Sequence, residues 1–319
     1  MRYFLGVDLG GTNIAVGVVN ELGELLGKHS VPTNPSRGFM AVVKDMADAC
    51  MIAADKVGLS MDDITNIGIG VPGSVDTKEG SVVLAVNLGW KGVPLADELN
   101  KYFEKPVYLG NDADCAALGE IFSGSAKGCS SAIMITIGTG IGGGIIMNKK
   151  IFSGCDGRGT EPGHYFLIYG GETCGCGQKG CFEAYASTTA LIRQTKRAME
   201  ENPDSKMWDL CGKKIDSVNG RTSFDAARIG DETALKVVDK FIEYLAAGTA
   251  GLVNIFRPEI VIYGGGVSHE GDYLLDPLNE KLQKLGYGTD LMPYPKAVRA
   301  TLGNDAGIIG AALLGFSEE

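Results

Sequence analysis

Three cysteines and a histidine lie close together between residues 164 and 181 of this 319-residue chain. The cysteines have the spacing Cys174-x-Cys176-x4-Cys181, and His164 precedes the first of them by ten residues. Three thiolates and one imidazole form the ligand set of a closed tetrahedral zinc site. Because this set leaves no open coordination position, the spacing predicts a structural Zn²⁺ ion rather than a catalytic one.

A disulfide is the alternative for these cysteines. Cys174 and Cys176 are too close in the chain for an unstrained bridge to each other, and the other five cysteines have no paired spacing. Scattered thiols are typical of a reducing compartment, which favours metal binding. Glu161 and Glu183 lie at the two ends of this glycine-rich loop, so we expect the zinc ion to orient their carboxylates toward a ligand.

The stretch DLGGTN, from Asp8 to Asn13, offers a site for phosphate groups. Consecutive glycines, Gly10 and Gly11, let the backbone approach an anion closely and direct N–H groups at it. Thr12 and Asn13 add side-chain donors, and Asp8 could hold Mg²⁺ directly or through water. The same stretch also makes a good hairpin turn, and alone it does not decide between the two interpretations.

A second glycine-rich stretch, IGTGIGGG at residues 137–144, contains the Gly-x-Gly-x-x-Gly spacing of dinucleotide-binding proteins. That fingerprint must open a helix, whereas IIMNKKIF follows here and predicts a strand and a turn. We therefore reject the dinucleotide-binding interpretation. The chain has no Walker A motif either, so it is not a P-loop protein, and the two Gly/Thr hairpins, one from each domain, could instead hold a triphosphate from both sides.

Two further stretches join a strand to a helical segment. In LGND, Asp112 stands where a general base for a hydroxyl nucleophile could be held in a fixed orientation. An aspartate that caps the following helix is the alternative, and this segment alone favours the cap. In YGGGVS, an adenine ring could lie flat on the backbone of Gly264, Gly265 and Gly266, although a tight turn explains these glycines equally well.

Secondary structure must position these stretches, and two of them belong to similar units. Residues 3–31 and 131–154 each contain an apolar run, a glycine-rich turn, a second apolar run, a polar turn and a third strand. The repetition predicts a duplicated architecture of two α/β domains that face each other across a cleft. The remaining pattern predicts strands at 64–73, 106–110 and 259–265, and helices near 38–57, 111–122, 188–201, 231–254 and 305–316.

Composition and charge restrict the class of protein. A formal net charge of −10 disfavours nucleic acid as a general partner, because such a surface repels phosphate backbones. The apolar stretch at the N-terminus is short and contains Asp8, so no signal peptide is predicted. No window approaches the roughly 18 uncharged apolar residues that a membrane helix needs. We expect a cytoplasmic globular protein without a membrane partner.

Taken together, the motifs resemble those of the ROK family of sugar kinases and repressors. The similarity follows the whole chain through DLGGTN, VPGSV, NLGW, GND, GTGIGGG, EPGH, CGCGQKGCFE and GGGVS. The pairing of EPGH with CGCGQKGCFE is its most specific part, and among family members the pattern is most similar to bacterial glucokinases. The resemblance implies the actin-like ATPase fold, a two-domain α/β fold of the ribonuclease H-like type with an interdomain cleft.

The resemblance also implies a reaction, namely ATP-dependent phosphorylation of a hexose hydroxyl with Mg²⁺, for glucose at the 6-hydroxyl. It implies Asp112 as the general base, and His164 with one ring nitrogen on zinc and the other toward the sugar. The implied sugar site consists of Gly73, Asn87, Asn111, Asp112, Glu161, His164 and Glu183. The implied ATP site consists of Gly10, Gly11, Thr12, Asn13, Thr139 and Gly140 for the phosphates, and of Gly264, Gly265 and Gly266 for the adenosine.

The domain limits follow from the same resemblance. Residues 1–111 would form the first domain, residues 112–302 a larger second domain, and residues 303–319 a helix that packs back on the first. Family members are often dimers or tetramers, which implies a homodimer or homotetramer here. Two positions depart from the family pattern: Pro162, where Val, Ile or Leu is usual, and Arg158, in a stretch usually made of small residues. Both leave the preferred sugar open.

Three alternatives compete with a glucokinase. A related kinase could act on N-acetylmannosamine, N-acetylglucosamine or fructose, which residues around position 2 of the sugar would decide. A sugar-sensing repressor would carry a winged-helix segment before DLGGT, but that stretch begins at residue 8 and leaves no room for one. Intact phosphate loops and Asp112 argue against an inactive, zinc-stabilised binding protein.

Overall fold

The computed structural model describes residues 1–155, 157, 159–288 and 291–316. Contacts divide the chain into two compact units, which are described separately here. Unit 1 comprises Met1–Met134, Gly144–Thr160 and Ala300–Glu319, and unit 2 comprises Ile135–Gly143 and Glu161–Arg299. The domain limits expected at residues 111–112 and 302–303 stay a prediction.

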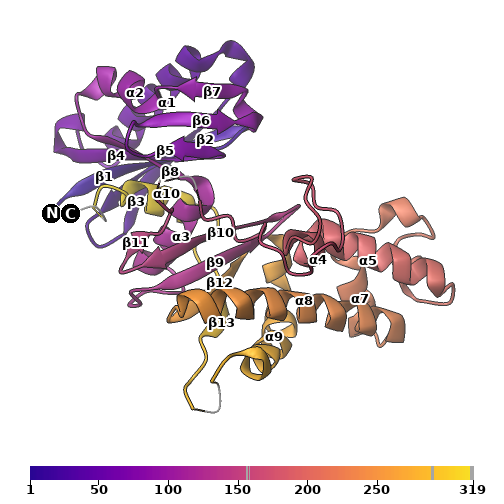
Figure 1. The fold of residues 1–319 in the computed structure, drawn as a ribbon. Coiled ribbons are helices and arrows are strands. Elements are labelled where there is room, and N and C mark those ends of the chain that lie inside the picture. Colours follow the sequence, from indigo (N-terminus) through magenta and orange to yellow (C-terminus); the bar gives the residue numbers. More distant parts are fainter. Residues whose placement is uncertain (156, 158, 289–290, 317–319) are drawn as a thin grey trace. The chain divides into compact units, whose positions relative to one another are not determined.

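Unit 1 is built on a five-stranded sheet with the order β3-β2-β1-β4-β8 (Figure 1). Its first three strands form antiparallel hairpins, and β4 and β8 run parallel to β1. The register pairs Asp8 with Gly70 and Gly70 with Gly110, so the ends of the parallel strands meet at one edge, where α/β sheets bind ligands. The strands are β1 (Tyr3–Leu9), β2 (Asn13–Asn20), β3 (Leu25–Pro32), β4 (Ile64–Val71) and β8 (Val107–Asn111).

Helices cover this sheet. The buried side of α1 (Phe39–Asp55) packs with the sheet and with α2 (Leu95–Phe103) in one hydrophobic core. Helix α10 (Asp305–Ala312) packs on β1, β4 and α3 (Asp112–Ser123). The contact with the strands is direct, because a Cβ atom on Gly6 would lie 1.8 Å from the Ile308 carbonyl oxygen.

Helix α10 is shorter than the predicted 305–316, since it ends at Ala312. The Leu313 and Leu314 N–H groups bond to carbonyls three residues back, at 3.2 and 3.1 Å, which tightens the chain into turns. A three-stranded antiparallel sheet of β5 (Ser74–Asp76), β6 (Ser81–Ala85) and β7 (Trp90–Val93) was not predicted. Its strands are too short to show a clear period.

The second sheet repeats the strand order of the first. Its order is β11-β10-β9-β12-β13. In both sheets, three consecutive strands lie side by side, and two later strands extend the sheet from the first of the three. The duplicated α/β architecture is therefore confirmed. The limit between the two units runs through β9 and β10. The strands are β9 (Ala132–Ile137), β10 (Ile141–Met147), β11 (Lys150–Ile151), β12 (Ile260–Gly264) and β13 (Lys296–Arg299).

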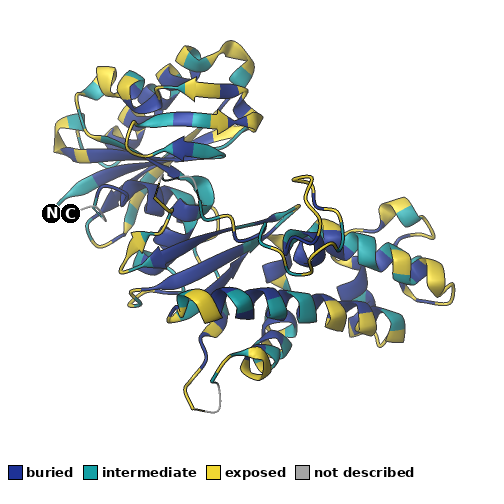
Figure 2. Cartoon of the chain, viewed as in Figure 1, coloured by how far each residue is buried: buried dark blue, intermediate teal, exposed yellow. Residues whose placement is uncertain are grey.

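Unit 2 is mainly helical beyond this sheet. Its long helix α8 (Glu232–Phe256) buries one side and exposes the other (Figure 2), and the Asp231 side chain caps its first turn by accepting a hydrogen bond from Ala234 N at 2.7 Å. The other helices are α4 (Glu183–Ala186), α5 (Thr188–Glu201), α6 (Met207–Leu210), α7 (Thr222–Arg228) and α9 (Asp272–Leu285). Among the described residues, no helix has both the length and the apolar character needed to cross a bilayer.

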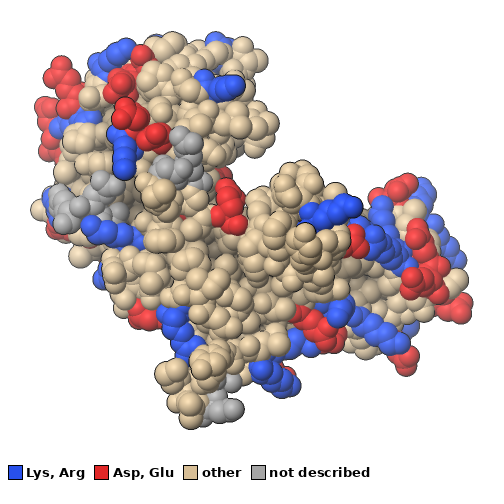
Figure 3. All heavy atoms as spheres, in the orientation of Figure 1, with Lys and Arg blue, Asp and Glu red and all other residues tan. Residues whose placement is uncertain are grey.

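The surface of unit 2 is mixed in charge. Basic and acidic side chains are interspersed over the end that contains α5 and α7 (Figure 3). Some of them form exposed ion pairs, such as Lys196 with Asp216 at 3.5 Å and Arg221 with Asp225 at 3.8 Å. Exposed pairs of this kind contribute little to stability individually.

A buried carboxylate holds the segment before α10. Glu120 in α3 is fully buried, and its carboxylate accepts hydrogen bonds from the backbone N–H groups of Thr301 and Leu302, both at 2.8 Å. It also accepts hydrogen bonds from Ser125 N at 2.7 Å and from Ser125 Oγ at 3.0 Å. Glu120 thus fixes the start of the C-terminal segment, including the helix that lies on β1 and β4.

Replacing Glu120 should destabilise the protein. In Glu120→Ala, several N–H groups lose a charged acceptor inside the protein, and we expect the free energy of unfolding to fall by about 3 kcal/mol. Urea unfolding followed by circular dichroism measures the change. The control is Glu79→Ala, at an exposed position in the same unit. Equal unfolding midpoints for the two variants would show that Glu120 does not hold this segment.

Candidate active site

The edge of the first sheet is organised by Asn111, the residue that precedes α3. Its side-chain oxygen accepts hydrogen bonds from Ala113 N at 2.9 Å and Asp114 N at 3.4 Å, and its side-chain nitrogen donates to the Gly73 carbonyl oxygen at 3.1 Å. Asn111 is therefore the helix cap, and the interpretation of Asp112 as the cap is wrong. Asp112 is instead the first residue of the helix, and its Oδ1 accepts a hydrogen bond from Ala113 N at 2.9 Å.

Burial changes the acidity of two carboxyl groups at this edge. It raises the pKa of Asp112, while hydrogen bonds from the backbone at Ala113 and from Asn111 oppose the rise. Burial also raises the pKa of Asp8 to about 6, with a further contribution from the negative charge of Asp112. Two partly buried carboxylates of like charge are stabilised by a cation, so this donor set fits Mg²⁺.

The first predicted phosphate loop is a hydrogen-bonded turn between β1 and β2. Gly10 N donates to the Asn13 carbonyl at 2.9 Å, and the Thr33 hydroxyl and N–H donate to the carbonyls of Gly10 and Thr12 at 2.7 and 2.8 Å. A Cβ atom on Gly11 would lie 3.4 Å from Asn87 Cβ, so the loop lies beside a second predicted site residue. The structure brings these residues together within unit 1.

A cavity of about 540 Å³ adjoins this loop and is also lined by Lys28, His29 and Lys56. The sequence did not indicate these basic residues as part of the site. Lys28 is an exposed residue of β3 that no sequence motif marks, and its Nζ lies 2.7 Å from Asp305 Oδ1. The cavity therefore combines backbone donors and basic side chains, which suit phosphate groups, with the carboxylates of Asp8 and Asp305.

The second phosphate loop, between β9 and β10, is fixed to the start of α5. Thr188 N donates to the Gly138 carbonyl at 3.0 Å, and the Thr189 hydroxyl donates to the Thr139 carbonyl at 2.7 Å. A strand follows this loop and no helix, so the rejection of a dinucleotide-binding fingerprint is confirmed. A Cβ atom on Gly140 would lie 2.1 Å from Glu183 Oε2, which places the Glu183 carboxylate directly against the loop.

The glycines at 264–266 lie near the same loop. Gly265 has a φ of 80°, and a Cβ atom there would lie 2.4 Å from the Ile137 carbonyl oxygen at the end of β9. Only glycine fits this close approach without strain. The Ser268 hydroxyl donates to the Gly265 carbonyl at 2.7 Å and holds the turn.

The predicted metal ligands converge in unit 2. The ligand atoms of His164, Cys174, Cys176 and Cys181 all lie within 4.8 Å of one another. Cys176 Sγ lies 3.7 Å from Cys181 Sγ, and Cys174 Sγ lies 3.7 Å from His164 Nδ1. Zn–S bonds of about 2.3 Å in a tetrahedron separate two sulfur ligands by about 3.8 Å, so the arrangement fits a zinc ion. Cys174, Cys176 and Cys181 form no disulfide, which argues against that alternative.

The metal loop is a small hairpin that ends at Glu183. Cys174 N donates to the Gln178 carbonyl at 2.9 Å, and the positive φ angles of Gly177 and Gly180, 89° and 96°, explain the glycines inside the motif. The Glu183 carboxylate lies 3.1 Å from Cys174 Sγ and accepts a hydrogen bond from Ile141 N at 2.9 Å. Its carboxylate therefore links the metal cluster to the second phosphate loop.

The neighbouring turn carries Glu161 and His164. His164 N donates to the Glu161 carbonyl at 3.1 Å, and His164 Nδ1 faces Cys174, so Nε2 points to the other side of the ring. Pro162, one of the two departures from the family pattern, is buried. It keeps an apolar side chain at this position, so the departure is mild. Arg158 lies outside the described residues.

The predicted site residues thus form two groups, each brought together within one unit. Unit 1 holds Asp8, Gly10, Gly11, Thr12, Asn13, Gly73, Asn87, Asn111 and Asp112. Unit 2 holds Thr139, Gly140, Glu161, His164, Cys174, Cys176, Cys181, Glu183, Gly264, Gly265 and Gly266.

Known proteins are similar to this chain in sequence and in fold over nearly their whole length. A family model described as the ROK family matches residues 4–317. A glucokinase of Thermotoga maritima is 39% identical over 97% of this chain and 95% of its own, and one of Halalkalibacterium halodurans is 38% identical over 100% and 96%. A ROK family glucokinase from Streptomyces griseus, solved with glucose and AMPPNP, is 37% identical, covers 98% of both chains and superposes with a TM-score of 0.75. The chain belongs to the ROK family, and its fold is that of the actin-like ATPases.

Proposed function

We propose that this protein is an ATP-dependent glucokinase, which transfers the γ-phosphoryl group of ATP to the 6-hydroxyl of glucose. The position of Asp112 carries the proposal, because Asn111 takes over the capping of α3 and leaves the Asp112 carboxylate at the ligand-binding edge of the sheet. The relatives named above are glucokinases, and one of them was solved with glucose and an ATP analogue. We extend their substrate pair to this chain.

Asp112 acts as the general base. Its carboxylate accepts the proton of the 6-hydroxyl as the hydroxyl oxygen bonds to the γ-phosphorus, and the bond to the β,γ-bridging oxygen breaks to release ADP. Asn111 orients the acceptor sugar, and Gly73 and Asn87 complete the sugar contacts of unit 1. Burial keeps Asp112 more basic than an exposed aspartate, which suits it to this proton transfer.

The phosphates of ATP bind to backbone donors. The N–H groups of Gly11 and Thr12 and the side chain of Asn13 bind one side of the phosphate chain, and Gly10 shapes the turn through its own N–H bond to the Asn13 carbonyl. Thr139 and Gly140 supply a second set of donors. Lys28 adds positive charge to the cavity of the first loop. Mg²⁺, when bound at Asp8, neutralises charge on the phosphates. The turn at Gly264–Gly266 supports the adenosine.

Unit 2 supplies further contacts to sugar hydroxyls from Glu161, His164 and Glu183. His164 uses Nδ1 toward the metal cluster, which leaves Nε2 for the sugar. Zinc, when bound by His164, Cys174, Cys176 and Cys181, ties the loop into one conformation and has no role in the chemical step. A cytoplasmic location and a homodimer or homotetramer stay predictions.

Removing the base should abolish turnover without removing the sugar site. Asp112→Asn keeps the shape of the side chain but cannot accept the proton, so we expect kcat with glucose and Mg-ATP to fall by about 10²- to 10⁴-fold while glucose binding is retained. Coupled ADP-release kinetics and calorimetry with glucose measure the two quantities. Because burial raises the pKa of Asp112, wild-type kcat/KM should fall on the acid side at a higher pH than a freely exposed aspartate would give.

The control for this experiment is Asp55→Asn, at an exposed position on α1. Near wild-type turnover in Asp112→Asn would remove Asp112 from the base role. If the wild-type protein itself releases no ADP with glucose, the proposed reaction is wrong.

Removing a metal ligand should loosen the sugar site. Purified protein should contain about one zinc ion per chain, as expected for a single four-ligand site. Cys176→Ser should lose most of this zinc, melt at a lower temperature and raise the KM for glucose by about 10- to 100-fold. Metal analysis, thermal unfolding and kinetics test this, with Cys155→Ser, an exposed cysteine outside the cluster, as the control. Protein that contains no zinc would contradict the metal assignment.

A further inference from the structure

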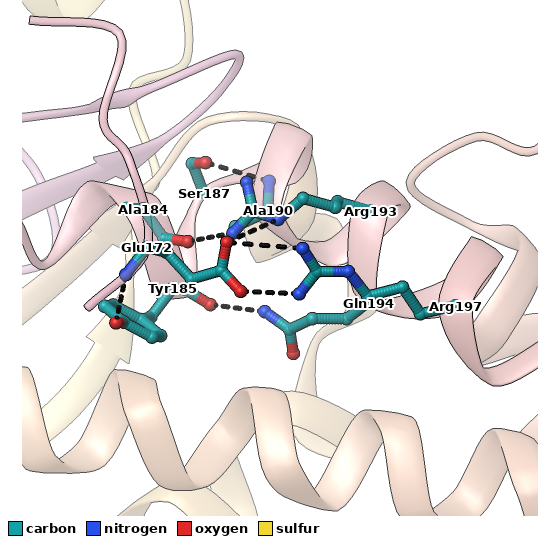
Figure 4. A network of polar contacts seen from close by, with 8 residues as sticks. All are labelled: Glu172, Ala184, Tyr185, Ser187, Ala190, Arg193, Gln194 and Arg197. Carbon is teal, nitrogen blue, oxygen red and sulfur yellow. Dashed lines mark hydrogen bonds and ion pairs between the residues drawn. The ribbon is translucent and has the colours of Figure 1, made fainter. Parts of the chain in front are cut away.

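Polar side chains from helix α5 contact the end of the short helix α4, which begins at Glu183 (Figure 4). Helix α4 has a single turn and ends at Ala186, so its last carbonyl groups lack the partners that a longer helix would supply. Ser187 N bonds to the Glu183 carbonyl at 3.2 Å. The next two carbonyls, of Ala184 and Tyr185, need hydrogen-bond donors from elsewhere in the chain.

Helix α5 supplies these partners. The Arg193 guanidinium donates to the Ala184 carbonyl, and the Gln194 side-chain amide donates to the Tyr185 carbonyl at 2.8 Å. Ser187 begins α5 by accepting a hydrogen bond from Ala190 N at 3.1 Å, which fixes the direction of this helix relative to α4. Two consecutive residues of α5 therefore hold the end of the turn that carries Glu183.

The same residues hold the metal loop. Glu172, two residues before Cys174, accepts hydrogen bonds from the Arg197 guanidinium, and Arg193 Nε lies 3.6 Å from its carboxylate. Its backbone N–H donates to the Tyr185 hydroxyl at 2.7 Å. Arg193 thus contacts both the end of α4 and the residue that leads into the metal loop, and its side chain is only 30% exposed.

Close packing leaves little freedom around this network. A Cβ atom on Gly171 would lie 1.8 Å from the Tyr185 hydroxyl oxygen. The backbone before Glu172 therefore packs directly against the hydroxyl end of the Tyr185 side chain. The rings of Tyr185 and Tyr244 lie 4.9 Å apart, and Tyr185 belongs to a small buried cluster with Cys174 and Cys181. A change in the orientation of α4 would therefore disturb the metal loop as well.

We propose that Arg193, with Gln194 and the Glu172–Arg197 pair, is a positioning residue that sets the orientation of Glu183 toward the sugar. The arrangement makes this specific, because one planar guanidinium meets a carbonyl of α4 on one side and a carboxylate of the metal loop on the other. The start of α5 also contacts the second phosphate loop through Thr188 and Thr189. This inference rests on the proposed function, since it assigns Glu183 to sugar binding.

The test compares Arg193→Met, Arg193→Lys and wild type in zinc-loaded protein. Met keeps the aliphatic stem but removes both polar contacts, so we expect the dissociation constant and the KM for glucose to rise by about 10- to 100-fold. The KM for ATP should change by less than the KM for glucose, since Thr188 and Thr189 still hold the second loop against α5 although Glu183 also contacts it. Lys should restore part of the affinity, because a single ammonium group cannot reproduce both contacts of the guanidinium.

Glucose binding is measured by calorimetry without ATP, and zinc content and melting temperature are measured on the same samples. Arg221→Met is the control, because Arg221 is an exposed arginine of unit 2 whose ion pair lies within its own turn. If Arg193→Met melts at a lower temperature but binds glucose with wild-type affinity, the network is merely structural and the inference fails.

Two outcomes keep the tests separate. If the wild-type protein neither binds nor phosphorylates glucose, the proposed function is wrong. If the wild type is active and Arg193→Met binds glucose with unchanged affinity, only the positioning role is wrong. If Arg193→Met does not fold, Glu172→Gln decides the question in the same assays, because it keeps the side-chain shape and removes the charge that pairs with Arg193 and Arg197. Unchanged glucose affinity in that variant overturns the inference.

Discussion

The cap that Asn111 places on helix α3 is the interaction on which the candidate active site depends most. A helix start needs an acceptor for its first N–H groups, and two adjacent polar residues could have supplied it. Because Asn111 takes this role and also donates to the Gly73 carbonyl, one side chain joins two strand ends of the sheet. Asp112 is then held in a fixed direction with its carboxylate available, as a general base requires.

Glycine makes the rest of the arrangement possible by allowing backbone and side chains to approach closely. Gly6 lets α10 lie directly on β1, and Gly140 admits the Glu183 carboxylate against the second phosphate loop. Glu183 also contacts the Cys174 thiol, so the loop that carries the metal ligands and the loop that is proposed to bind phosphate share one carboxylate. Through this shared carboxylate, a zinc ion bound at the cluster would influence substrate binding without entering the chemistry.

Much of the fold followed from local sequence patterns. The two glycine-rich hairpins, the strands that follow them and the Cys₃His cluster were predicted, because period, turn residues and ligand spacing are encoded over a few positions. The choice of Asn111 over Asp112 as the cap was not, since it depends on the tertiary contact with Gly73. The Arg193 contacts and the Lys28 side of the phosphate cavity were missed for the same reason, because they join residues that are distant in sequence and have no motif of their own.

The choice of sugar tests the central claim most directly. Purified protein with Mg-ATP should be assayed for ADP release with glucose, mannose, fructose, N-acetylglucosamine and N-acetylmannosamine, and the kcat/KM values compared. We expect glucose to be preferred by about 10-fold or more and to be converted to glucose 6-phosphate. Preference for an N-acetylated sugar would contradict the glucokinase assignment while retaining the mechanism, and no ADP release with any of the five sugars would contradict both.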